Sequence, residues 1–154
     1  MVDERKEAEE GPEDTTPNIY ICNIQGLYNA SDLTKPNILL DLATTNEIFC
    51  MCLCEIHLKD NVQDLEIIRL GWNIVRSDWK LRIGGGVEIY LDERIPISEK
   101  LLYSNSMCET TGVYLPLSDL VIITVYRPPS CVVDKFDECV NEISKWLKSI
   151  VNNI

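Results

Sequence analysis

Three polar side chains stand directly at the ends of apolar stretches in this chain, and their types suit phosphate chemistry. Asn23 follows IYIC, Glu55 follows IFCMCLC, and Tyr126 follows LVIITV. If these stretches are neighbouring strands, their ends gather at one edge of a sheet, where layered α/β folds hold their ligands. A carboxylate there needs a cation or an arginine partner, and Mg²⁺ suits it because this ion prefers oxygen ligands and keeps waters for a substrate phosphate. The residues alone therefore indicate a metal-dependent site.

Each of these residues also has an ordinary structural role to play. A strand-end Asn23 is a common turn-former, Glu55 can form an ion pair or lie beside the start of the following segment, and Tyr126 can be a half-buried aromatic. The neighbouring Arg127 can be a solvated charge. The glycine run at 84–86 precedes a strand and not a helix, so it fits a flexible turn better than a phosphate-binding loop.

The seven cysteines give a second, weaker candidate site. Cys50, Cys52 and Cys54 alternate along one stretch, and His57 follows, which raises the hypothesis of a zinc site. Structural zinc ligands usually lie on turns, whereas a stiff strand spreads alternate side chains too far apart. The cysteine number is odd and the N-terminus has no apolar signal region, so we favour reduced, mostly buried thiols.

The elements that must position these residues are visible in the pattern of apolar side chains. Residues 1–17 are rich in glutamate and lack periodicity, which predicts a disordered acidic tail before a folded domain at 18–154. Apolar runs and alternation predict strands, whereas helical spacing after Thr34 and from Asp134 predicts two helices. The strands are expected at 18–24, 47–55, 71–78, 84–91, 97–104, 109–117 and 120–127, with a hairpin between the last two. This order indicates a layered α/β or α+β domain.

Composition and charge limit the classes of function. The chain of 154 residues has a net charge of −11, so simple electrostatic attraction to nucleic acid is not expected. Any binding to a polyanion requires a local basic patch or a bridging cation. No apolar run approaches the roughly 18 residues that span a bilayer, and no signal peptide is visible. We therefore expect an intracellular protein, nuclear or cytoplasmic, without a membrane partner.

Four segments in this order resemble the endonuclease/exonuclease/phosphatase superfamily. They read NIQGL, IFCMCLCEIHL, VRSDWKLRIGGGVEIYL and VYRPPS, and together they span about Asn18 to Phe136. The segments look most like the endonuclease domains of non-LTR retrotransposons. This resemblance implies a four-layer α/β sandwich of two facing sheets with helices outside. The chain would carry its N-terminal half, a mixed sheet flanked by helices, and the parent activity would be Mg²⁺-dependent phosphodiester hydrolysis that nicks DNA.

The resemblance also implies roles for individual residues. Glu55 would bind the metal, Asn23 would donate a hydrogen bond near the scissile phosphate, and Tyr126 would contact or orient that phosphate. The basic side chains that accompany these motifs are expected to contact phosphate or nucleic acid; they are Arg76, Arg82 and Arg127.

The later motifs of the family do not occur in these 154 residues. A Gly-Asp-Phe-Asn strand and a Ser-Asp-His segment normally supply the residues that activate water, and His57 lies at a variable place where it cannot replace them. We therefore expect a truncated domain with little or no nuclease activity alone, which dimerises or aggregates through an uncovered sheet face. The alternative is a catalytically dead, domesticated module that binds a protein.

Overall fold

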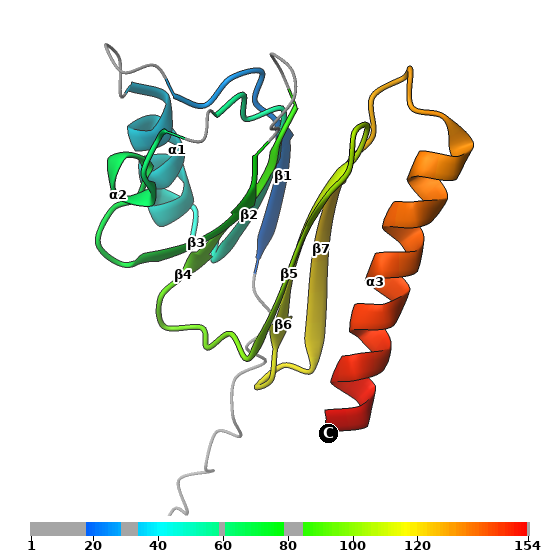
Figure 1. Ribbon diagram of the computed structural model, residues 1–154. Coiled ribbons are helices and arrows are strands. Elements are labelled where there is room, and N and C mark those ends of the chain that lie inside the picture. Colours follow the sequence, from blue (N-terminus) through cyan, green and yellow to red (C-terminus); the bar gives the residue numbers. More distant parts are fainter. Residues whose placement is uncertain (1–17, 29–33, 59–60, 79–84, 154) are drawn as a thin grey trace, which may run out of the picture.

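The computed structural model describes residues 18–28, 34–58, 61–78 and 85–153. They form two sheets and three helices (Figure 1). The first sheet has the order β1-β2-β4-β3, in which β1 and β2 are parallel and the other pairs are antiparallel. The second sheet is antiparallel with the order β5-β6-β7. The strands are β1 (Ile19–Asn23), β2 (Cys50–Cys54), β3 (Trp72–Ser77), β4 (Val87–Asp92), β5 (Glu99–Ser104), β6 (Glu109–Leu115) and β7 (Leu120–Tyr126).

The elements stack in four layers, as Figure 1 shows. Helices α1 (Thr34–Thr45) and α2 (Asp64–Ile67) cover the outer face of the first sheet, and α3 (Val133–Asn153) covers the outer face of the second. Buried side chains fill all three spaces between the layers. The middle space, between the two sheets, contains Cys50, Cys52, Val75, Ile89, Leu91, Val113, Leu115 and Ile122. The predicted α/β sandwich is therefore present.

Strand β2 shows why its sequence is a continuous apolar run. Met51 and Leu53 pack towards the helices, whereas Cys50 and Cys52 pack towards the second sheet. Because successive strand residues point to opposite faces, a strand covered on both sides needs apolar residues at every position. The β6–β7 hairpin and the amphipathic α3 also lie where the sequence predicts them.

The prediction of an uncovered sheet face holds only in part for the residues described. The inner faces of the two sheets pack against each other over most of their width, because β5–β7 already supply the second sheet. The inner face of the edge strand β1 stays uncovered, since Ile19 is 42% exposed and Ile21 is 75% exposed. Dimerisation through this face stays a prediction. The predicted tail at 1–17 lies outside the described residues.

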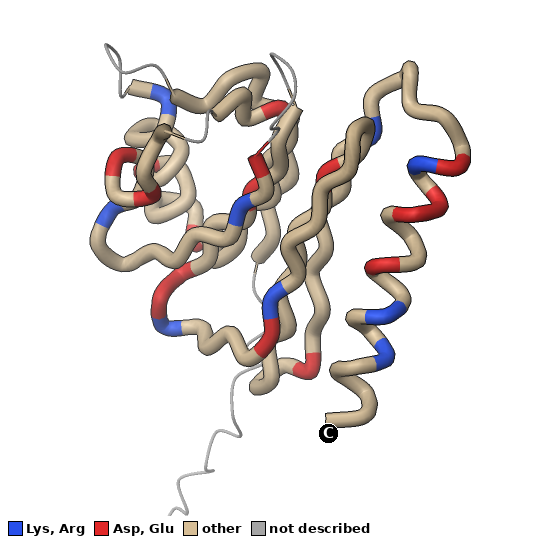
Figure 2. The backbone as a smooth tube through the Cα atoms, in the orientation of Figure 1, with Lys and Arg blue, Asp and Glu red and all other residues tan. Residues whose placement is uncertain are grey.

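Charged residues lie mainly on the loops and on the outer helices. Figure 2 shows acidic and basic positions interspersed along α3, with no continuous basic stripe on any described element. No helix in the described part of the chain is both long enough and apolar enough to cross a membrane.

Candidate active site at the strand ends

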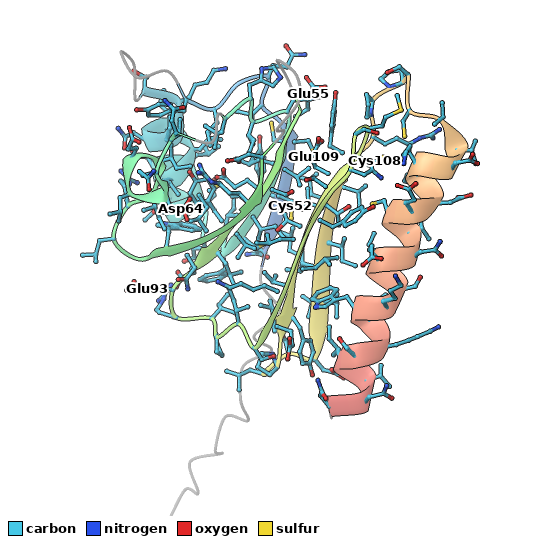
Figure 3. The ribbon with its side chains drawn as sticks, in the orientation of Figure 1. Cys52, Glu55, Asp64, Glu93, Cys108 and Glu109 are labelled. Carbon is cyan, nitrogen blue, oxygen red and sulfur yellow. The ribbon has the colours of Figure 1, made fainter. Side chains whose placement is uncertain are left out.

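The ends of β1, β2 and β7 lie at the same edge, and they place Glu55 and Tyr126 near each other. Asn23 ends β1 opposite Cys54, and Glu55 follows Cys54 directly. Tyr126 ends β7, where its phenol lies close enough to the Glu55 carboxylate to feel its charge. Burial and, after it, the negative charge of Glu55 raise the pKa of Tyr126 above its usual value. Figure 3 shows Glu55 at this end of the sheets, with Glu109 close by.

The loops that follow β1 and β2 hold one another through backbone hydrogen bonds. The Gly26 amide donates to the Glu55 carbonyl at 2.7 Å, and the His57 amide donates to the Gly85 carbonyl at 2.9 Å. Glu55 and His57 both have a φ of 55°, in the left-handed region that non-glycine residues seldom occupy. Such local strain persists only where surrounding structure fixes it, and it concentrates at functional sites.

Gly86 allows these loops to pack closely. A Cβ atom at this position would lie 2.6 Å from Cγ1 of Ile56, and the glycine φ is +86°. A side chain here is therefore excluded by both space and backbone conformation. This is a more specific role than the flexible turn that the sequence suggests for 84–86, although Gly84 itself lies outside the described residues.

Lys35, at the start of α1, fixes the loop behind Asn23. Its Nζ donates to the Gly26 carbonyl at 2.8 Å and to the Ile24 carbonyl at 3.2 Å. Asn23 itself uses Oδ1 to accept a hydrogen bond from the Gln25 amide at 3.3 Å. The turn-forming role of Asn23 is thus real, and its exposed side chain lies at the end of β1, opposite Cys54 in register.

His57 lies closer to the site than the sequence indicates. Its Nε2 is 3.8 Å from Oε2 of Glu55. In a regular strand, the side chains of residues two apart project in parallel from the same face. The left-handed backbone at both residues departs from this geometry and lets the two side chains approach each other. A sequence pattern cannot predict that these two side chains approach each other. Their approach depends on the left-handed backbone conformation of Glu55 and His57, which the neighbouring loops impose.

Glu109 is a second carboxyl group that the sequence analysis missed. It is the register partner of Tyr126 on β6, it is 1% exposed, and its Oε2 accepts a hydrogen bond from the Gly86 amide at 3.5 Å. Burial raises the pKa of Glu109 to about 8, so the group is mostly protonated at neutral pH. The sequence does contain a signal for its burial. Along a strand, Glu109 falls on the same face as the apolar Val113 and Leu115, which face the core.

Of the three arginines predicted to contact phosphate or nucleic acid, the two that the structure describes have partners other than Glu55. Arg76 lies on the helix side of β3, 3.0 Å from Asp64 and 3.4 Å from Asp78. The guanidinium of Arg127 lies 5.0 Å from the Phe136 ring centroid, and its Nη2 donates to the Cys131 carbonyl at 3.4 Å. Arg82 is outside the described residues. Contact with nucleic acid by these arginines stays a prediction.

The chemistry of the donor set fits a hard cation better than zinc. No group of three or more His, Cys, Asp or Glu side chains in the described regions is arranged to hold a metal ion. The zinc hypothesis for Cys50, Cys52, Cys54 and His57 is therefore contradicted, and all seven cysteines are free thiols as expected. Glu55 offers a single accessible carboxylate, which suits Mg²⁺ because this ion retains most of its waters.

A separate cavity of about 450 Å³ lies at the opposite end of β2. It is lined in part by Phe49, Trp72, Asp92 and Arg94. Phe49 precedes β2 whereas Glu55 follows it, so this cavity does not open onto the Glu55–Tyr126 contact.

Comparison with known proteins finds solved structures of similar fold. No protein-family model and no curated protein sequence matches the chain. An AP endonuclease from Archaeoglobus fulgidus has a TM-score of 0.56 and 15% identity, covering 85% of this chain and 51% of its own. The 3′ phosphatase NExo from Neisseria, bound to a product DNA hairpin, has a TM-score of 0.57 and 16% identity. The match covers 88% of this chain and 53% of the NExo chain. The chain thus spans about half the length of these structures, and it shares their α/β sandwich fold.

Proposed function

We propose that this chain forms one wall of a Mg²⁺-dependent site that hydrolyses a phosphodiester in DNA. The observation that carries this proposal is the proximity of the Tyr126 phenol and the Glu55 carboxylate at the ends of the two sheets. A phenol donor and an accessible carboxylate at this edge are the groups that a metal-assisted attack on phosphate requires. The solved structures of similar fold, an AP endonuclease and a DNA-bound 3′ phosphatase, support the same class of substrate.

The residues of this wall would act as follows. Glu55 would hold the cation, and the Tyr126 hydroxyl would turn from Glu55 to a phosphate oxygen. The Asn23 amide would donate a second hydrogen bond to the phosphate as negative charge develops. A bound Mg²⁺ supplies Lewis acidity and charge neutralisation at the phosphoryl oxygen. The sequence motifs extend the proposal to endonuclease domains of the non-LTR retrotransposon type.

We expect this wall to work poorly by itself. The chain has a single histidine, His57, and it lies 3.8 Å from the carboxylate assigned to the metal. The segments that the resemblance assigns to water activation are not contained in these 154 residues. General acid–base catalysis contributes about 10²–10⁴-fold to rate, so the chain alone should nick DNA at a rate near background.

Cation binding tests the proposal without depending on turnover. Mn²⁺, a paramagnetic substitute for Mg²⁺, should broaden the NMR signals of the Asn23 side-chain amide and of the Glu55 backbone amide. Glu55→Gln should remove this broadening. Glu93→Gln is the matched control, because it makes the same change of charge at an exposed residue far from the site (Figure 3). If broadening persists in Glu55→Gln, the metal assignment is wrong.

Phosphate binding tests the role of the phenol separately. With Mg²⁺ present, a short single-stranded oligonucleotide should shift the same Asn23 signal, and Tyr126→Phe should weaken that shift several-fold. A chain that binds neither Mn²⁺ nor the oligonucleotide, yet captures a protein partner in the presence of EDTA, would instead support the alternative of a catalytically dead interaction module.

A further inference from the structure

Three buried cysteines gather at the end of the second sheet, beneath the start of α3. Cys108 and Cys139 are fully buried, and Cys131 is 6% exposed. The sulfur atoms of Cys108 and Cys131 are 3.2 Å apart, whereas Cys139 Sγ contacts the Thr110 hydroxyl at 2.8 Å. Figure 3 shows Cys108 at this end of the sheet. The cluster adjoins the strand ends that carry Glu109 and Tyr126, but none of its thiols is assigned to the proposed cation site.

The backbone around the two contacting thiols is held in place. Asn105 accepts hydrogen bonds from the Met107 and Cys108 amides at 2.8 Å, and its Nδ2 donates to the Lys135 carbonyl at 2.7 Å. The Cys131 amide donates to the Pro128 carbonyl at 3.0 Å. Both turns are thereby tied to their surroundings, so the sulfur contact follows from the fold and not from a chance side-chain orientation.

We propose that Cys108 and Cys131 form an oxidisable dithiol that a hydroperoxide converts into a disulfide. Cys131 is the more exposed thiol and reacts first: its thiolate attacks the peroxide oxygen, forming a sulfenic acid and releasing water or an alcohol. The Cys108 sulfur then attacks the Cys131 sulfur, the S–O bond breaks, and a second water leaves. Two thiols lose two electrons, the peroxide gains them, and both thiol protons end in the products.

The order of these steps follows from the environment of each thiol. Burial raises the pKa of the Cys108 thiol to about 12, so Cys108 is a poor first nucleophile. It becomes competent only when an electrophilic sulfur lies in contact with it. Cys131, in the β7–α3 turn, keeps 6% of its surface exposed whereas Cys108 keeps none, so a small oxidant reaches Cys131 first.

The remaining five cysteines are not placed to form a disulfide in the same way. Cys50 and Cys52 project in parallel from one face of β2, with Cβ atoms roughly 6.6 Å apart, whereas a disulfide needs about 3.5–4.5 Å. Cys22 packs on the helix side of the first sheet, but Cys54 is opposite Asn23 in register and faces the other way. Cys139 is engaged by Thr110.

A disulfide here would fix the turn that follows Tyr126. Cys108 directly precedes Glu109, the register partner of Tyr126, and Cys131 lies in the turn that contains Pro128. The bond would close a loop between positions 23 residues apart. It should therefore shift the unfolding equilibrium towards the folded state by on the order of a hundredfold.

Peptide mass spectrometry of the folded, full chain identifies the bond directly. The protein is treated with hydrogen peroxide, its remaining thiols are alkylated in denaturant, and it is digested with trypsin. Trypsin cuts after Lys100 and Lys135 but not between Arg127 and Pro128, so Cys108 and Cys131 share one peptide and Cys139 lies in the next. A disulfide between the proposed pair lowers the mass of that one unalkylated peptide by two hydrogen atoms, whereas a disulfide to Cys139 joins two peptides.

We expect the intrapeptide disulfide in the wild type and in Cys139→Ser, and a thiol reductant should reverse it. When the chain is oxidised in denaturant, its cysteines pair at random, so the Cys108–Cys131 disulfide should no longer predominate. Cys131→Ser should leave Cys108 alkylatable. The wild-type experiment needs no substitution, so a poorly folded variant does not affect it. A bond to Cys139, or oxidation of Cys22 and Cys54 while Cys108 and Cys131 stay reduced, would overturn the proposal.

Discussion

The phenol of Tyr126, at the end of the second sheet, lies close enough to Glu55, at the end of the first, for the carboxylate charge to raise the pKa of the phenol. The two residues are far apart in the sequence and come from different sheets, so their contact depends on how the sandwich is assembled. At a partly buried position such an interaction is screened less by solvent than at an exposed one. This contact therefore links the packing of the two sheets to the geometry of the candidate site.

A double-mutant cycle should measure this link. Tyr126→Phe and Glu55→Gln should each lower the free energy of unfolding slightly, and the double variant should lose less than the sum of the two. We expect a coupling energy of about 1 kcal/mol from urea unfolding, because both side chains keep some contact with water. Tyr126→Phe combined with the distant Glu93→Gln should be additive. Additivity in both pairs would show that the phenol and the carboxylate do not interact.

The sequence predicts the strands that carry this site better than it predicts which side chains meet there. Alternating and continuous apolar runs predict the strands that end at Asn23 and Tyr126, because their burial leaves a period-two signature. Glu109 and His57 escape prediction since their roles depend on which strand and which loop lie opposite them. Arg76 is assigned to nucleic acid by its motif, yet its partners Asp64 and Asp78 become neighbours only when the chain folds.

The buried Glu88 should make stability fall as pH rises. Glu88 is fully buried, both of its carboxyl oxygens lack a hydrogen-bond partner among the described residues, and burial raises its pKa to about 8. In the unfolded chain its pKa returns to about 4.3. Between these values the folded state binds more protons than the unfolded state, so the free energy of unfolding falls by up to about 1.4 kcal/mol per pH unit.

Urea unfolding at several pH values checks this slope. Glu88→Gln should flatten the decline between about pH 5 and 8 and should make the protein more stable at pH 8. Glu109, whose pKa is also raised to about 8, adds a decline of the same sign, so Glu88→Gln alone leaves part of it. The exposed Glu93→Gln should keep the wild-type slope. An unchanged slope in Glu88→Gln would mean that Glu88 ionises normally in the folded chain.

A methyl group at Gly86 should disrupt the strand-end loops. The added Cβ would lie 2.6 Å from Ile56 Cγ1 at a φ of +86°, so Gly86→Ala should lose about 2–4 kcal/mol of unfolding free energy. Gly71 is the matched control. It has a φ of +96° but nothing within 4 Å of its ideal Cβ position, so Gly71→Ala should lose only about 1 kcal/mol. Equal losses would show that close packing against Ile56 contributes nothing beyond backbone strain.

Removal of the Trp146 ring should loosen α3 from the second sheet. Trp146 is 9% exposed and packs over Gly112, where an added Cβ would lie 3.0 Å from the indole ring. Trp146→Ala leaves a large cavity, so we expect a loss of about 3–5 kcal/mol in urea unfolding followed by circular dichroism. Val151→Ala, on the same helix but 71% exposed, should change stability by less than about 0.5 kcal/mol. A small loss for Trp146→Ala would mean that α3 is not held to the second sheet through this ring, and that β7, which carries Tyr126, is positioned by β6 and the facing sheet without help from α3.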